Sequence, residues 1–235
     1  MRTLELSNYG LWVRTGTTDI KICQEVIDRK TYERPRLGFV PGDRPGEVWA
    51  DLGANIGAFS HRYAGSVEKI YAYEPDPDTY RVLELNLEPH PNVTPVQVAV
   101  ADYTGTATFT QREVMNSRNT MYRAGRWSRS KDVVDIEVPV ISGADLPHDV
   151  NCVKADVEGA EKPLMDVLPF DRIDKFVMEW SWDVWPEFAD FNRAMAQLRD
   201  IYPNVRPAKD HPAEGQWPSS WFPPCTNVFA WRETS

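Results

Sequence analysis

A glycine-containing turn between two apolar runs most constrains how this chain can fold. Residues 48–57 read Val-Trp-Ala-Asp-Leu-Gly-Ala-Asn-Ile-Gly, and a second apolar run at 69–73 ends on Glu74. A strand, a glycine turn, a helix and a second strand ending on an acid make up a βαβ nucleotide-binding unit. Gly53 and Gly57 lack a Cβ, so the backbone can turn sharply there and a ligand can lie against it. The pattern predicts an α/β fold with a mostly parallel, doubly wound sheet.

Glu74 is the firmest candidate for ligand binding. It follows Asp51 by 23 residues, close to the offset of about 20 residues at which an acid accepts hydrogen bonds from a ribose. A carboxylate can accept from both ribose hydroxyls. We therefore expect a ligand that contains an adenosine-like ribose.

The spacing of the glycines distinguishes two cofactors. The turn reads Gly-x-Asn-x-Gly behind Asp51, whereas dinucleotide folds favour Gly-x-Gly-x-x-Gly, which lets a pyrophosphate approach the helix. An acid at the end of the strand repels pyrophosphate and attracts an ammonium or a sulfonium. This favours S-adenosylmethionine over NAD, with Asp51 either on the methionine ammonium or capping the helix. Asn55 either touches the ligand or adopts the left-handed backbone of the turn.

Four blocks in the same order resemble the FkbM family of class I methyltransferases. They are residues 51–57, 73–75, 98–102 and 153–161, and the run 14–19 is similar to that family's leader. The resemblance implies a Rossmann-like class I methyltransferase fold: a seven-stranded sheet with an antiparallel last strand and a short N-terminal extension. It implies that S-adenosylmethionine is bound through Asp51, Gly53, Asn55, Gly57, Glu74 and Asp102. Asp102 would lie against the adenine amino group, and its alternative role is that of a turn aspartate.

The block from Lys154 to Glu161 carries the most reactive side chains. It lies at the end of a predicted strand, where open α/β sheets bind their ligands. Methyl transfer to oxygen needs an acceptor in line with the sulfonium and a group that removes its proton. Asp156 or Glu158 is the candidate base or orients the acceptor hydroxyl. Lys154 and Asp156 point the same way and can pair; Lys154 could also hold a substrate carboxylate or, with a depressed pKa, act as the base.

A second strand end adds Glu179 to the candidate catalytic residues. Trp180 and Trp182 follow it and form either an aromatic wall for the acceptor or part of the core. For Glu161 we favour a first-turn helix acid. No histidine joins the acids at a spacing typical of metal sites, so we predict no metal and give the four isolated histidines no role.

Periodicity and turn residues place the remaining elements. We expect an extension at 1–46 and a methyltransferase domain at 47–235. The extension holds two short strands, a helix over 20–27 and a linker at 35–46. The domain's expected elements are helices at 56–64, 77–87, 161–168 and 188–198, strands at 48–52, 69–73, 93–100, 151–156, 175–180 and 226–231, and a hairpin that pairs 106–109 with 133–140.

Charge and composition narrow the possible partners. The net charge of −9 argues against a nucleic-acid-binding surface, although residues 112–131 form a locally basic stretch inside a long loop that is either functional or disordered. Three scattered cysteines support neither a disulfide framework nor a zinc site. No apolar run is long enough to span a membrane and no signal peptide is recognisable, so we expect a soluble cytoplasmic protein.

The sequence thus predicts an S-adenosylmethionine-dependent methyltransferase, and the resemblance favours O-methylation of a hydroxyl on a sugar or secondary metabolite. The alternatives are methylation of nitrogen or of an RNA hydroxyl, a non-catalytic nucleotide-binding module, and an NAD-dependent oxidoreductase. Acceptor identity is not encoded in these motifs, because substrate pockets in such folds depend on variable loops. Whether the chain forms a homodimer also stays open.

Overall fold

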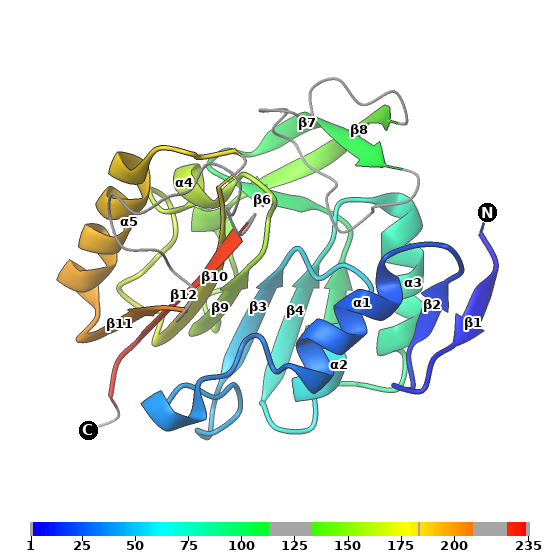
Figure 1. Cartoon of the computed structure of the whole chain (residues 1–235), viewed down its shortest axis with the longest axis horizontal. Coiled ribbons are helices and arrows are strands. Elements are labelled where there is room, and N and C mark those ends of the chain that lie inside the picture. Colours follow the sequence, from blue (N-terminus) through cyan, green and yellow to red (C-terminus); the bar gives the residue numbers. More distant parts are fainter. Residues whose placement is uncertain (1, 113–132, 183, 209–224, 234–235) are drawn as a thin grey trace, which may run out of the picture.

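The computed structural model describes residues 2–112, 133–182, 184–208 and 225–233 (Figure 1). Within these ranges the central sheet has seven strands. In spatial order they are β11 (Asn204–Pro207), β12 (Cys225–Trp231), β10 (Lys175–Ser181), β9 (Cys152–Ala155), β3 (Val48–Leu52), β4 (Lys69–Tyr73) and β5 (Val93–Val96). The strands from β10 to β5 run parallel, and β12 is antiparallel to both of its neighbours. This confirms the predicted sheet and its antiparallel last strand.

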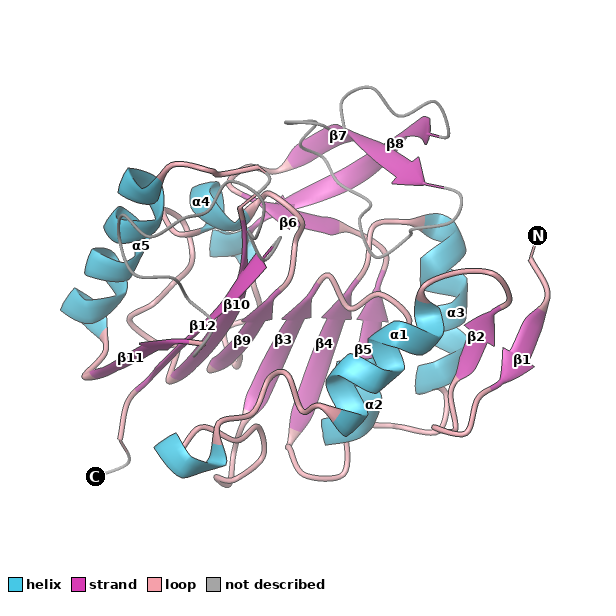
Figure 2. Ribbon diagram, in the orientation of Figure 1, coloured by secondary structure: helices cyan, strands magenta, loops and turns pink. Residues whose placement is uncertain are grey.

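The sheet is covered on both faces (Figure 2), which is why its strands are apolar throughout. β3 is buried at all five positions, and its side chains alternate between two hydrophobic clusters. Ala50 and Leu52 pack with α4 (Glu161–Leu164) and α5 (Phe188–Ile201). Trp49 packs on the other face, with α2 (Ala58–Tyr63) and α3 (Pro77–Leu87). The sheet is therefore doubly wound, as predicted.

The N-terminal segment lies against the face that carries α2 and α3. The predicted strands are present as β1 (Leu4–Leu6) and β2 (Trp12–Arg14), and β2 is joined to α3 through Asn86. The predicted helix divides into α1 (Asp19–Cys23) and a π-helix, η1 (Gln24–Asp28), and a 3-10 turn, η2 (Pro35–Leu37), follows. Arg14 and the fully buried Asp19 form a bidentate ion pair with N···O distances of 2.9 Å. The leader motif is thus a structural clamp between β2 and α1.

Two glycines in the loop after β3 have different structural reasons. Gly53 has φ 73°, and a Cβ there would lie 1.8 Å from the carbonyl oxygen of Asp156, so the loop after β9 touches its backbone. Gly57 has φ 86° and precedes α2, and a Cβ there would lie 2.8 Å from Leu83. Because Gly57 is left-handed, the helix begins at Ala58 and not at Ile56 as the sequence suggested.

The expected strand at 93–100 is wrong as one element. β5 ends at Val96, and β6 (Ala99–Ala101) joins a separate sheet with β7 (Gly105–Arg112) and β8 (Val133–Ser142). The amide of Val98 bonds back to the carbonyl of Val96, which turns the chain out of the main sheet. Pro95 has no N–H, which is tolerated because β5 is an edge strand. The hairpin of β7 and β8 is confirmed with antiparallel pairing.

Other elements match the sequence to different extents. Asp76 caps α3 by accepting from the amides of Asp78 and Thr79, as predicted from the Asp-Pro start. The helix expected at 161–168 is α-helical only to Leu164 and continues as turns. β11 was not expected, because its four residues show no strand periodicity and form a sheet edge.

His61 and His90 are neighbours in space although they are 29 residues apart. Nδ1 of His61, on α2, lies 2.9 Å from Nε2 of His90, which follows α3, so the rings share one proton. Burial and the adjoining His90 lower the pKa of His61. The expectation that these two histidines are isolated is therefore wrong, since no local pattern links the ends of the two helices.

Lys175 holds the loop before β3 against the sheet. Its side chain is fully buried, and its ammonium group contacts the carbonyl of Val40 at 2.7 Å and the carboxylates of Asp43 and Glu47. A buried ammonium is tolerated when its charge and its protons are matched in this way. The segment expected to be a linker is thus tied to the first residue of β10.

We expect Lys175→Met to lower the free energy of unfolding by about 3–5 kcal/mol, because the carboxylate of Glu47 then stays buried without its counter-ion. Urea unfolding followed by circular dichroism measures this loss. Lys69→Met is the matched control, because Lys69 pairs with Asp149 at 3.8 Å with both side chains more than a third exposed. Its loss should stay below about 1 kcal/mol, and equal losses in the two variants would contradict the role of Lys175.

The histidine pair should make stability depend on pH. Because the pKa of His61 is lowered on folding, the unfolded chain takes up this proton first, and the stabilisation present above about pH 6.5 is lost as pH falls. Relative to His61→Gln, the wild type should lose stability between about pH 7.5 and about pH 5.5 in urea titrations. The exposed His148 provides the control variant His148→Gln, whose pH dependence should match the wild type.

Candidate functional site

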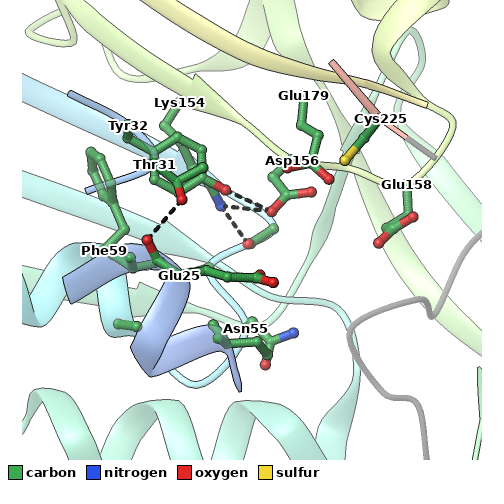
Figure 3. Close-up of a pocket in the computed structure, with 15 residues that line it drawn as sticks. Glu25, Thr31, Tyr32, Asn55, Phe59, Lys154, Asp156, Glu158, Glu179 and Cys225 are labelled. Carbon is green, nitrogen blue, oxygen red and sulfur yellow. Dashed lines mark hydrogen bonds and ion pairs between the residues drawn. The ribbon is translucent and has the colours of Figure 1, made fainter. Parts of the chain in front are cut away.

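A cavity of about 210 Å³ opens where β3 and β9 end, beside the glycine loop (Figure 3). This is where open α/β sheets bind their ligands. Its walls come from segments far apart in the chain. The described residues that line it are Ile22, Glu25, Val26, Thr31, Tyr32, Gly53, Ala54, Asn55, Ala58, Phe59, Lys154, Asp156, Glu158, Glu179 and Cys225.

Asp51 and Lys154 form a buried ion pair behind the glycine loop. Nζ of Lys154 lies 3.0 Å from Oδ1 of Asp51, and Ser60 donates to Oδ2 of the same carboxylate at 2.8 Å. Lys154 also donates to the backbone carbonyl of Gly53 at 2.7 Å. One side chain thus holds the end of β9 to the loop after β3. Asp51 is fully buried and does not line the cavity, so its contact with a methionine ammonium stays a prediction.

The charges around Lys154 keep its ammonium protonated. Burial by itself lowers the pKa of Lys154, but the carboxylates of Asp51 and Asp156 outweigh burial, and the pKa is raised. The pairing of Lys154 with Asp156 that strand alternation predicts is confirmed at 3.8 Å. A lysine base needs a depressed pKa. The structure therefore favours Lys154 as a partner for the two carboxylates over Lys154 as the base.

Tyr32 joins the site from a segment that the sequence did not single out. Its hydroxyl donates to Oδ2 of Asp156 at 2.9 Å, and its ring packs edge to face on Phe59. Burial, then the charges of Asp156 and Glu179, raise the pKa of Tyr32 well above its usual value, so the hydroxyl stays a donor. No motif marks Tyr32, because its partner is 124 residues away.

The amides of the glycine loop are all engaged by the protein itself. Those of Gly53 and Ala54 donate to the carbonyl of Tyr73 at 3.0 and 2.8 Å. The three that follow, from Asn55 to Gly57, donate to Glu74 Oε2, to the Asn55 side chain and to the Ala54 carbonyl. A pyrophosphate would need such amides as donors. The loop therefore offers its surface to a ligand and not its N–H groups.

The predicted loop residues fall into two groups. Gly53 and Asn55 line the cavity, whereas Gly57 contacts leucines of α3 and does not line it. Asn55 has φ 51°, which confirms the left-handed turn geometry. Whether Asn55 also touches a ligand remains a prediction.

Glu74 lies at the end of β4 and is 6% exposed. Its Oε2 accepts from the Asn55 amide at 3.0 Å and its Oε1 from the Asp76 amide at 2.9 Å. Each oxygen has two lone pairs, so both can accept a second hydrogen bond. Burial, chiefly, raises its pKa to about 8, while the two amides lower it. Glu74 is not among the residues that line the cavity, and its ribose contact stays a prediction.

Asp102 follows β6 and is exposed at the start of the turn into β7. It does not line the cavity either. Its proposed contact with an adenine amino group therefore stays a prediction.

The candidate acids of the acceptor side line one cavity. Glu158 follows β9 with a left-handed φ of 46°, and Glu179 projects from β10. Burial, followed by the charge of Asp156, raises the pKa of Glu179 to about 8, although the Cys225 thiol donates a hydrogen bond to it. Burial and the same carboxylates raise the pKa of Cys225, so this cysteine is an uncharged thiol. Cys225 is a lining residue that the sequence did not indicate.

The aromatic residues after Glu179 belong to the core. Trp180 and Trp182 are 0% and 2% exposed, and both rings contact Phe191 of α5. The aromatic wall is therefore wrong for these two side chains, and the core alternative is confirmed. Glu161 starts α4 as expected, but it is buried, accepts from the Gly159 amide and the Ser181 hydroxyl, and has a pKa raised by burial to about 7.

Two searches of the described residues gave no site. They contain no group of three histidine, cysteine or acidic side chains placed to hold a metal ion. None of their helices has the length and hydrophobicity needed to cross a bilayer. The basic stretch at 112–131 lies outside the described side chains.

Comparison with solved structures supports the fold. An FkbM methyltransferase from Methylobacillus flagellatus KT superposes with a TM-score of 0.52 at 15% identity, over 88% of this chain and 47% of that one. Precorrin-6y C5,15-methyltransferase from Geobacter metallireducens GS-15 gives a TM-score of 0.46 at 16% identity, over 84% of this chain and 85% of that one. Magnesium protoporphyrin IX methyltransferase from Synechocystis PCC 6803 gives 0.47 at 13% identity, over 94% and 85%.

Family comparison is more specific. None of the curated proteins matches the chain. The methyltransferase FkbM domain, however, matches residues 51–202, which is more than half of the sequence and includes the glycine loop, Glu74 and the block around Asp156. The chain, which has a Rossmann-like class I methyltransferase fold, therefore belongs to the FkbM family of methyltransferases.

Proposed function

We propose that this methyltransferase transfers a methyl group from S-adenosylmethionine to a hydroxyl of a sugar or secondary metabolite. The observation that carries the proposal is the placement of Asp156. Its carboxylate lines a cavity beside the glycine loop, where the Tyr32 hydroxyl and the Lys154 ammonium orient it. A carboxylate fixed in this way is suited to remove a proton from a bound hydroxyl.

The residues present fit the cofactor of this family. Gly53 and Asn55 form a wall without N–H groups to offer, which suits a methionine chain better than a pyrophosphate. Glu74 keeps acceptor capacity for the ribose hydroxyls, and Asp102 would meet the adenine amino group. Acidic side chains around the cavity suit a sulfonium cation. When bound, S-adenosylmethionine supplies an electrophilic methyl group.

Each remaining acid has a role in this proposal. Asp156 accepts the proton of the acceptor hydroxyl, while Lys154 and Tyr32 hold its second oxygen. Glu158 and Glu179 orient the acceptor from the two sides of Asp156. With a pKa of about 8, Glu179 is largely protonated at neutral pH and can donate a hydrogen bond to an acceptor oxygen.

An RNA acceptor has less support. The basic stretch that favours it lies outside the described side chains, and the carboxylates of the cavity repel phosphate. Methylation of nitrogen and a non-catalytic binding role remain alternatives, and the activity of an Asp156 variant distinguishes the second of them from an enzyme.

Calorimetry should show binding of S-adenosylhomocysteine and no binding of NAD. Glu74→Ala should weaken S-adenosylhomocysteine binding on the order of tenfold, because the ribose loses its acceptors. Glu84→Ala changes an exposed acid of α3 and should leave the affinity unchanged. Binding of NAD, or equal affinity in the two variants, would contradict the cofactor assignment to Glu74.

Asp156→Asn should lower methyl transfer by about 100-fold or more, because the amide keeps the shape but accepts no proton. The measurement is mass spectrometry of hydroxyl-bearing sugars and natural products after incubation with S-adenosylmethionine. Binding of S-adenosylhomocysteine should stay within about threefold of the wild type. An active Asp156→Asn would move the role of the base to another acid, and a wild type that binds the cofactor but methylates no hydroxyl would contradict O-methylation.

A further inference from the structure

We propose that the acceptor carries a cationic amine next to the hydroxyl that is methylated, as an amino sugar does, and that Glu25 and Glu158 bind this amine. The inference rests on the proposed methyl transfer in the same cavity and defines the chemical class of the substrate. Its basis is the charge of the cavity wall and the origin of that charge in two segments.

Carboxylates outnumber cations on the wall of the cavity. Among the described residues that line it, the ionisable side chains comprise one ammonium group, one phenol, one thiol and four carboxylates, which are Glu25, Asp156, Glu158 and Glu179. The ammonium is that of Lys154, which is 3% exposed and already paired with Asp51 and Asp156. The cavity therefore presents no uncompensated cation of its own to a carboxylate or phosphate on a substrate.

The titratable groups of the cavity report the same negative potential. Burial is the largest cause of the raised pKa of Tyr32, Glu179 and Cys225, and neighbouring carboxylates raise all three further. The sulfonium of the cofactor brings one positive charge into this region. Two carboxylates besides Asp156 and the largely protonated Glu179 still face the acceptor.

Glu25 and Glu158 reach the cavity from opposite ends of the sequence. Glu25 belongs to the π-helix η1, and Figure 3 shows its side chain extending into the cavity, with Asp156 and Glu158 beyond it. A π-turn aims a side chain differently from an α-helix and is frequent at functional sites. Glu25 also forms an exposed pair with Arg29 at 4.0 Å. Such a surface pair contributes only about 0–1 kcal/mol, so an ammonium of a ligand can compete with it.

The amine is the group that is bound, and the hydroxyl is the group that reacts. Negative potential favours the protonated amine, which has no lone pair with which to attack the methyl group. The neighbouring hydroxyl oxygen forms the new bond to the methyl carbon while the carbon–sulfur bond breaks, and the sulfonium becomes a thioether. The hydroxyl proton passes to Asp156 and then to solvent.

Three sugars that differ in one substituent test this proposal. Protein saturated with S-adenosylhomocysteine is titrated with methyl glucosaminide, methyl glucoside and methyl glucuronide, which are cationic, neutral and anionic. We expect the glucosaminide to bind at least about tenfold more tightly than the glucoside, and the glucuronide to bind most weakly. The preference should shrink as salt is added, because the ion pairs are partly exposed.

Variants of the two acids locate the preference. Glu25→Gln and Glu158→Gln should each reduce the ratio of glucosaminide to glucoside affinity several-fold. Glu84→Gln, which changes an exposed acid of α3 outside the cavity, should keep it. A preference that survives in both cavity variants would overturn the assignment to Glu25 and Glu158.

The outcomes separate this inference from the proposed function. If S-adenosylhomocysteine binds but the three sugars bind equally, or the glucosaminide does not bind, the cationic acceptor is wrong while the methyltransferase assignment stands. Tighter binding of the glucuronide would also overturn the inference. If S-adenosylhomocysteine itself does not bind, the failure belongs to the proposed function.

Discussion

The structure depends on the contact between the ends of β3 and β9, where Lys154 meets Asp51 and the carbonyl of Gly53. Two buried charges are stable there because each is matched, with Nζ of Lys154 3.0 Å from the Asp51 carboxylate and Ser60 donating to the other oxygen. The close approach of the two loops leaves no room for a Cβ at Gly53. This junction sets where the glycine loop lies and, through the same lysine, where Asp156 points.

The N-terminal segment completes the site that this junction begins. Tyr32 binds the Asp156 carboxylate, and Glu25 enters the cavity from the π-helix η1. Both residues precede the part of the chain that matches the FkbM domain. A clamp between Arg14 and Asp19 and the contact of η1 with α2 hold the segment in place. The common domain therefore provides the cofactor side, while residues outside it shape the acceptor side.

Electrostatics unite the two halves of the site. A sheet edge that gathers carboxylates favours a cofactor with a sulfonium and keeps Lys154 protonated. The same field keeps Tyr32 and Cys225 uncharged and raises the pKa of Glu179. These shifts follow from one cause, which is burial of several acids around a small cavity. The acid that remains ionised beside a protonated neighbour is the arrangement that acid–base chemistry needs.

The sequence by itself determined the elements whose signals are local. Strand and helix periods, the Asp76 cap and the left-handed Asn55 depend on neighbours within a few residues, and the family motif placed Asp156 and Glu158 at a strand end. Alternation along one strand was enough to predict that Lys154 and Asp156 pair. Only the tertiary structure decided the partners that come from distant segments: Tyr32 on Asp156, His61 against His90, Lys175 on the loop before β3, and Trp180 in the core. Such pairs arise because packing brings side chains together that are far apart in the chain, and no period or motif in a single sequence records which of them will meet.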